Sequence, residues 1–143
     1  MRLWHYRLLP YLPREQLVSQ WRECVCIAKD VHDNGTPNHI LVNYVTEYSS
    51  EQFMIYAKQV MWEMESRGYS VSDKSKEKLR SYTGCDFPDY ECRGNPFEHH
   101  HNWYYLRICM ANLMEKLNAA ENAAGIHVLC DGYKEITNEI YKL

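Results

Sequence analysis

Apolar residues recur every three or four positions in three long stretches of the chain, which is the spacing of one buried helix face. The stretches run from Pro13 to Gly35, from Ser49 to Gly68 and from Pro96 to Gly125. Their apolar positions are, in order, Leu17, Trp21, Cys24, Val25 and Ala28; Phe53, Tyr56, Val60, Met61 and Met64; and Leu106, Cys109, Met110, Leu113 and Leu117. The pattern therefore predicts three principal helices.

Local signals mark the ends of these helices. Proline suits the first turn of a helix, and Pro13 and Pro96 stand where the first and third stretches begin. Ser49, with Gln52 three residues later, forms a capping box at the start of the second stretch. Glycines 35, 68 and 125 close the three helices.

The connecting segments add only short elements. Residues 34–39 and 83–95 are predicted loops, and residues 40–45 are a short apolar stretch of uncertain type. Charged residues 73–81 predict a short exposed helix, and residues 133–141 predict a last short one. Because no long alternating pattern and no internal repeat occurs, we expect an all-α fold, with the 143 residues in one domain.

Composition narrows the class of protein. No window approaches the roughly 18 consecutive apolar residues of a membrane span. Polar residues and a proline (Arg2, His5, Arg7 and Pro10) interrupt the start of the chain, so no signal peptide is predicted. We therefore expect a cytoplasmic monomer whose six cysteines are thiols.

Charge is distributed unevenly along the chain. The whole protein has a formal net charge of −3, whereas residues 1–29 hold five basic and two acidic side chains, a net of +3. The basic residues there are Arg2, Arg7, Arg14, Arg22 and Lys29. This asymmetry is either ordinary surface scatter or a local positive field directed at phosphates.

The first two residues suggest a chemical group. Because methionine aminopeptidase accepts only small residues after the start, Arg2 predicts that Met1 is retained with its free α-amine. The α-amine of a polypeptide ordinarily titrates near pH 7.7–8.0, so part of it is neutral at physiological pH. Such an amine is a plausible Schiff-base nucleophile when a carboxylate lies beside it.

Glu23 is the candidate carboxylate. It borders the apolar stripe of the first helix, since it lies about 100° around the axis from Cys24. Partial desolvation at this position would favour proton exchange, with Arg22 and Arg2 as compensating cations. The alternative is a solvated Arg22–Glu23 charge pair, which is common on helices.

Several short motifs together resemble a known family. They are Met1-Arg2-Leu3-Trp4, Leu12-Pro13-Arg14, Arg22-Glu23, Asn38-His39, Glu65-Ser66-Arg67-Gly68-Tyr69 and Pro96-Phe97-Glu98. The chain resembles the pyrimidine-dimer DNA glycosylases of the phage endonuclease V type, especially a bacterial branch with the same opening. The resemblance covers most of residues 1–117.

The resemblance implies a compact helical enzyme that is both DNA glycosylase and abasic-site lyase and that needs no cofactor. Its substrate would be double-stranded DNA with a damaged or modified base, pyrimidine dimers by resemblance. The Met1 amine would attack C1′ of the damaged nucleotide and form an imine, with Glu23 as the acid–base residue. Arg22 and Arg2 match phosphate-binding positions, and Arg14 belongs to the same basic segment.

Three other residues are candidate DNA contacts. His39 follows a turn and would contact phosphate or lesion, with a capping or core-edge role as the alternative. Trp103 and Tyr104 begin an aromatic run that would stack on bases, with helix packing as the alternative.

Two rival interpretations stay open. The fold without the chemistry would make a helical module that binds nucleic acid or protein. Cys85, Cys92 and the histidines 99–101 offer thiolate and imidazole ligands for a zinc-stabilised interaction domain. However, the six-residue gap between the cysteines is longer than usual, so a polar first turn of the third helix is the preferred interpretation.

Overall fold

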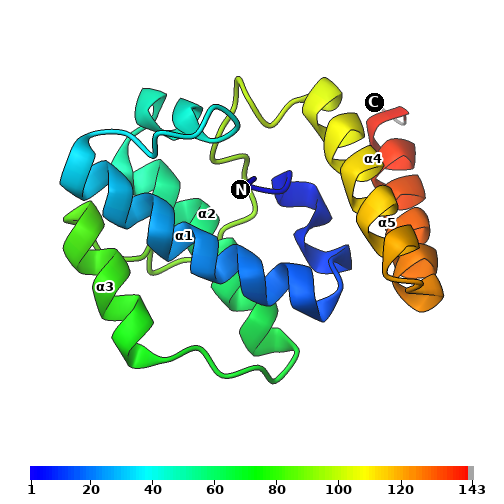
Figure 1. Ribbon diagram of the computed structural model, residues 1–143, viewed down its shortest axis with the longest axis horizontal. Helices are drawn as coiled ribbons and strands as arrows, with labels where there is room; N and C mark the ends of the chain where they lie inside the picture. Colours follow the sequence, from blue (N-terminus) through cyan, green and yellow to red (C-terminus); the bar gives the residue numbers. More distant parts are fainter. Residues whose placement is uncertain (142–143) are drawn as a thin grey trace.

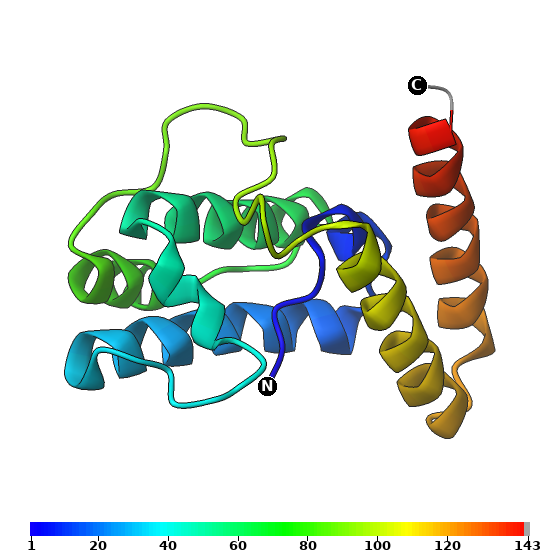
Figure 2. The same ribbon diagram turned by 90° about the horizontal axis from the view of Figure 1, so that it is seen from above.

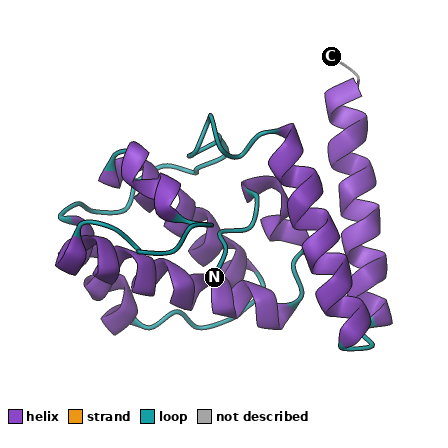
Figure 3. Ribbon diagram, turned by 45° about the horizontal axis from the view of Figure 1, so that its top comes forward, coloured by secondary structure: helices purple, strands orange, loops and turns teal. Residues whose placement is uncertain are grey.

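The structure, a computed structural model, describes residues 1–141, with the side chains of residues 140 and 141 left undescribed. Over this range the chain forms five α-helices and two 3₁₀ helices and contains no strand (Figure 3). The expected all-α fold is therefore confirmed. None of these helices is long and apolar enough to cross a membrane.

The elements follow one another as η1 (Tyr6–Tyr11), α1 (Arg14–Asn34), η2 (Asn43–Glu47), α2 (Ser50–Ser66), α3 (Asp73–Thr83), α4 (Trp103–Ala119) and α5 (Ala123–Tyr141). The first two predicted helices and the short charged one are confirmed as α1, α2 and α3. Gly35 ends α1 in the left-handed conformation with φ 78°. Ser49 and Gln52 form both bonds of the predicted capping box of α2.

The predicted third helix is wrong at both ends. It begins at Trp103 rather than at Pro96, because Asn102 is the N-cap and accepts a hydrogen bond from the Tyr105 amide at 3.0 Å. It ends at Ala119, and Gly125 lies inside the first turn of α5. The expected first helical turn at residues 96–101 is instead a series of turns around the buried Phe97 ring.

The molecule has two helical layers with the N-terminal segment, residues 1–12, between them. Helices α1, α2 and α3 pack together on one side, and α4 and α5 form an antiparallel hairpin on the other (Figure 1). The segment lies between α1 and α4 in Figure 1, and in Figure 2 it runs across α1 toward the start of α4. The first residues of the chain are thus enclosed by its last two helices.

The N-terminal segment is part of the hydrophobic core, which the helix-based pattern did not predict. Leu3 and Leu8 are fully buried, and Trp4 is 6% exposed. The Arg67 guanidinium, just after α2, donates to the carbonyl oxygens of Leu12 at 2.7 Å and of Pro10 at 3.0 Å. The N-terminal segment is therefore fixed by its buried side chains and by the hydrogen bonds of Arg67 to its backbone carbonyls.

Helix α5 completes the enclosure by packing on η1. The Tyr11 hydroxyl donates to Glu135 at 2.8 Å, and Arg7 pairs with Glu139. Burial and the adjacent Glu135 raise the pKa of Tyr11 from 10.0 to about 12. Gly132 lies directly on the Tyr11 ring, since a Cβ there would be 2.2 Å from its nearest ring atom.

Candidate active site

The structure brings the first residues of the chain against Glu23 on α1. The backbone N–H of Arg2 donates to Glu23 Oε2 at 3.3 Å. One residue spans at most about 3.6 Å, so the Met1 amine lies within about 7 Å of that oxygen. Within residues 1–141 the amine forms no ion pair, and Met1 is 41% exposed. The Met1 amine and the half-buried Glu23 carboxylate are therefore neighbours, and Met1 is accessible to solvent.

Gln20, one turn before Glu23 on α1, connects these groups. Its Nε2 donates to the Arg2 carbonyl at 3.1 Å and to Glu23 Oε2 at 3.2 Å. Its Oε1 accepts from the Trp4 amide at 2.7 Å. The Tyr56 hydroxyl, which donates to the Trp4 carbonyl at 2.6 Å, lies 3.2 Å from the same Oε1. Gln20 is 1% exposed, so this network is removed from water. The sequence analysis missed this residue, although a polar side chain three positions after the core residue Leu17 was a usable signal.

Tyr105 of α4 supports the same segment from the opposite side. Its hydroxyl donates to the Leu3 carbonyl, and the Arg2 guanidinium lies over its ring at 5.7 Å from the centroid. Desolvation raises the pKa of the Tyr105 hydroxyl, and the nearby Arg2 cation opposes that shift. Tyr105 therefore stays a neutral donor that binds the Leu3 carbonyl. The Arg2 guanidinium lies against α4, over the Tyr105 ring.

Two buried histidines, of which one belongs to the N-terminal segment, pack against each other. His5 and His101 stack with ring centroids 5.3 Å apart. His101 Nδ1 accepts from the Tyr6 amide at 3.1 Å, so Nε2 carries the hydrogen and donates to the Tyr44 hydroxyl at 2.8 Å. Burial lowers the pKa of both imidazoles, that of His5 from 6.5 to about 4. They are neutral near pH 7 and serve as packing and hydrogen-bonding groups.

The three predicted phosphate-binding arginines remain without carboxylate partners among the described residues. Arg22 is exposed on α1 beside Glu23, and Arg14 lies about 12 Å further along that helix, over the Tyr69 ring. Neither these two nor Arg2 forms an ion pair with a carboxylate in residues 1–141. By contrast, Arg67 and Arg93 both pair with glutamates. Arg2, Arg14 and Arg22 are therefore available to an external anion, whereas Arg7 and Lys29 pair with Glu139 and Asp33.

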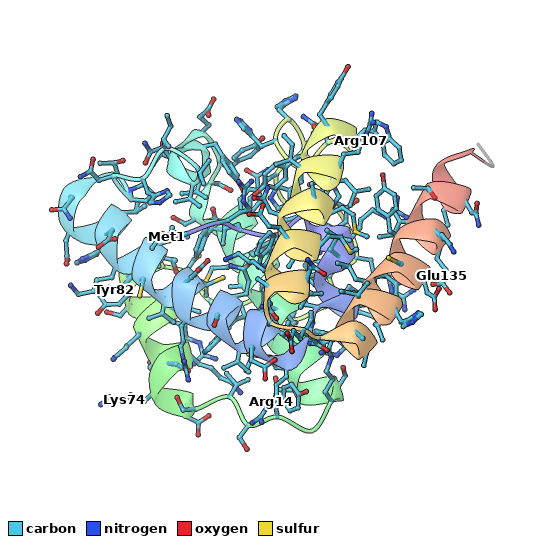
Figure 4. The ribbon with its side chains drawn as sticks, turned by 45° about the vertical axis from the view of Figure 1, so that its right-hand side comes forward. Met1, Arg14, Lys74, Tyr82, Arg107 and Glu135 are labelled. Atoms are coloured by element: carbon cyan, nitrogen blue, oxygen red, sulfur yellow. The ribbon has the colours of Figure 1, made fainter. Side chains whose placement is uncertain are left out.

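Helix α4 carries a fourth arginine of this kind, which the sequence analysis did not select. Arg107 is exposed and forms no ion pair in the described part of the chain (Figure 4). Tyr104, one turn earlier, is 76% exposed and is free to stack, whereas Trp103 is half-buried and packs against the core. The predicted stacking platform is therefore divided between one exposed ring and one packed ring.

His39 lies in the loop that follows α1. Its backbone N–H donates to Asn43 at 2.8 Å, and its Nδ1 accepts from the Leu41 amide at 3.3 Å. Asn38, just before it, adopts the left-handed conformation with φ 54°. The imidazole therefore has a local structural role as the acceptor of a turn, and its partial exposure leaves the other nitrogen accessible.

The zinc ligands considered from the sequence do not gather in one place. Among residues 1–141 no three His, Cys, Asp or Glu side chains are grouped as a metal ion requires. His101 uses both ring nitrogens within the protein. His100 accepts from the Tyr48 hydroxyl at 2.7 Å, and its other nitrogen lies 3.3 Å from Glu47. The histidine run joins η2 to the segment that precedes α4.

Comparison with known proteins identifies the family. Residues 1–78 match the family model described as pyrimidine dimer DNA glycosylase, whereas neither curated proteins nor solved structures gave a match. The matched range holds the N-terminal segment, α1, η2, α2 and the start of α3, including Met1 and Glu23. It covers more than half of the 143 residues and confirms the resemblance seen in the sequence motifs. The chain therefore belongs to the pyrimidine dimer DNA glycosylase family.

Proposed function

We propose that the protein excises damaged or modified bases from double-stranded DNA, with pyrimidine dimers as the expected lesion. It also nicks the strand at the resulting abasic site. The nucleophile is the Met1 α-amine, and the acid–base residue is Glu23. The observation that carries the proposal is the hydrogen bond from the Arg2 amide to Glu23 Oε2, one residue away from the amine. DNA is the substrate that the family implies.

The chemistry proceeds in two stages. The lone pair of the neutral amine forms a bond to C1′, and the C1′–N bond to the base breaks. The base leaves with the electron pair of that bond and takes up a proton. Opening of the sugar ring, by cleavage of C1′–O4′ with proton transfer to O4′, then gives the imine. The exposed Met1 amine and the half-buried Glu23 carboxylate support these assignments.

The second stage is the β-elimination. The Glu23 carboxylate removes a proton from C2′, the C3′–O bond breaks, and the 3′-phosphate leaves with the electron pair. Water then hydrolyses the imine and regenerates the amine. Each transfer needs one group that accepts and donates a proton beside C1′ and C2′, which suits a single carboxylate next to the amine.

Binding of the substrate requires that the duplex open at the lesion. Exposing C1′ costs a few kcal/mol, least at a damaged or mismatched base. Phosphate contacts from Arg2, Arg14 and Arg22 supply part of this energy, because none of them is neutralised by a carboxylate of the described chain. His39, Trp103 and Tyr104 are proposed to make secondary contacts.

Borohydride trapping on a duplex with one abasic site tests the proposal. Borohydride reduces an imine to a stable amine, so the native protein is expected to form a covalent adduct that mass spectrometry maps to the Met1 α-amine. Glu23→Gln is expected to lower strand cleavage by at least about 100-fold, the lower end of the contribution that general acid–base catalysis typically makes.

Two controls define the alternative outcome. An N-terminal extension is expected to abolish the adduct but leave duplex binding intact, because it blocks only the amine. A well-folded native protein that binds the duplex without forming an adduct would refute the lyase assignment. It would then be a helical nucleic-acid-binding module.

A further inference from the structure

We infer that Gln20 is a positioning residue of the proposed reaction. Its carboxamide forms hydrogen bonds to the backbone of residues 2–4 and to the Glu23 carboxylate. These bonds fix the two groups relative to each other and so determine where the Met1 amine lies relative to Glu23. The inference rests on the proposed function and adds a residue to which the family match and the sequence motifs give no role. It is argued from three hydrogen bonds and the burial of the side chain.

Both faces of the Gln20 carboxamide are used. A primary amide offers two N–H donors and a carbonyl with two lone pairs. The two donors bind the Arg2 carbonyl and Glu23, and the carbonyl oxygen accepts from the Trp4 amide. The Tyr56 hydroxyl lies 3.2 Å from that oxygen and donates its proton to the Trp4 carbonyl at 2.6 Å. Glutamate lacks the donors, methionine lacks every polar group, and asparagine is one methylene shorter. Glutamine is the residue type that fits this position.

Two of the Gln20 hydrogen bonds bind the backbone on either side of Leu3. The Arg2 carbonyl and the Trp4 amide flank this residue, and one carboxamide binds both, much as a neighbouring strand would. Leu3 itself is fully buried and its carbonyl accepts from Tyr105. The chain therefore has little freedom at residue 3, and only Met1 and the Arg2 side chain extend beyond the fixed part.

The remaining donor of Gln20 fixes the carboxylate. Glu23 Oε2 accepts two neutral N–H groups, one from Gln20 and one from the Arg2 backbone. Gln20 and Glu23 are three residues apart on α1, which places their side chains on neighbouring positions of one face. No hydrogen bond between described residues uses Glu23 Oε1. This second oxygen therefore remains available for proton transfer.

Two Gln20 variants and one matched control test the inference. Gln20→Met removes the whole network at similar volume, and Gln20→Glu keeps only the acceptors. Gln16→Met is the control, because Gln16 lies one turn earlier on α1 and its Oε1 is buried without a partner. The assays are the rate of borohydride-trapped adduct at saturating abasic duplex and the affinity for a duplex with a tetrahydrofuran abasic analogue.

Gln20→Met is expected to lower the trapping rate on the order of 100-fold, as a misplacement of about 1 Å does in other enzymes. Its affinity for the analogue should stay within about threefold, because the phosphate contacts are unchanged. Gln16→Met should match the native protein in both assays. A Gln20→Met trapping rate within about twofold of the native rate would overturn the inference.

Gln20→Glu keeps the inference testable if Gln20→Met fails to fold. An ionised carboxylate cannot donate to Glu23, whereas a protonated one has an O–H donor. The ratio of variant to native trapping rate should therefore rise as the pH falls from 8 to 6. A ratio that is constant over this range would overturn the inference. Absence of any adduct from the native protein would overturn the proposed function and this inference with it, so the two failures are distinct.

Discussion

The buried imidazoles of His5 and His101 give the core a dependence on pH. Both rings are almost inaccessible to water and pack against each other, and His5 belongs to the N-terminal segment. A histidine whose folded-state pKa lies below its unfolded value stabilises the fold only while it is neutral. The stability is therefore complete above the unfolded pKa and decreases as the pH falls.

The pKa of His5, lowered from 6.5 to about 4, sets the range of this effect. Its contribution to the free energy of unfolding should be lost between pH 6.5 and 4, by about 3 kcal/mol in total. His5→Asn should flatten this dependence, because asparagine keeps an acceptor for the Arg7 amide but does not titrate.

Urea denaturation at several pH values from 7.5 to 4 measures this pH dependence of the free energy of unfolding. His39→Asn is the control, since His39 also accepts a backbone N–H but in a half-exposed loop, and it should retain the native pH dependence. Identical curves for His5→Asn and the native protein would contradict the assignment to His5.

At the scale of elements, the sequence predicted those helices whose ends are marked by local signals. Gly35 and the Ser49–Gln52 box identified α1 and α2 because those residues form the caps themselves. The α4–α5 break was misplaced, since the left-handed residue there is Glu121 with φ 55° rather than a glycine. Nothing in the local sequence marks that conformation, which is stabilised by the packing of the hairpin.

The candidate site, like the helices, could be predicted only in part from the sequence. Its place at the edge of the apolar stripe left Glu23 either partly buried or a solvated partner of Arg22, and the family resemblance selected it as the candidate. The structure places it half-buried beside the Arg2 amide. The burial of residues 1–12 did not follow, because a segment without helical periodicity has no pattern that indicates burial. Gln20 and Tyr105 were missed for this reason, since both act on that segment.

The contact between α5 and η1 can be tested at Gly132. A Cβ at this position would lie 2.2 Å from the Tyr11 ring, so the helix or the ring must move. Gly132→Ala should destabilise the protein by about 1–3 kcal/mol, although alanine is the better helix former by about 1 kcal/mol. The melting temperature in thermal unfolding measures this effect.

Gly94→Ala is the control, because a Cβ there meets nothing within 4 Å, and its melting temperature should differ little from that of the native protein. Equal melting temperatures for the two variants would contradict the close packing of Gly132 on Tyr11.

At the scale of the whole molecule, the proposed binding of DNA by a protein with net charge −3 depends on a few arginines that have no carboxylate partner among the described residues. Each phosphate contact contributes about one unit to the slope of log affinity against log salt concentration. Arg22→Gln should therefore weaken duplex binding and reduce that slope by about one. Arg93→Gln is the matched control, because Arg93 is 81% exposed but already paired with Glu91. Fluorescence anisotropy at several salt concentrations measures both slopes, and an unchanged slope for Arg22→Gln would place Arg22 outside the interface.

The enclosure of the N-terminal segment also determines when the proposed site is assembled during synthesis of the chain. Leu3 is synthesised 102 residues before its partner Tyr105. At about 5–20 residues per second, the amine waits roughly 5–20 seconds for α4. During that interval the amine is an ordinary chain terminus, because the contacts with α4 that fix the N-terminal segment have not yet formed. Only a chain synthesised through α4 and α5 has the proposed nucleophile in place, so a partial translation product carries the amine without the contacts that would position it.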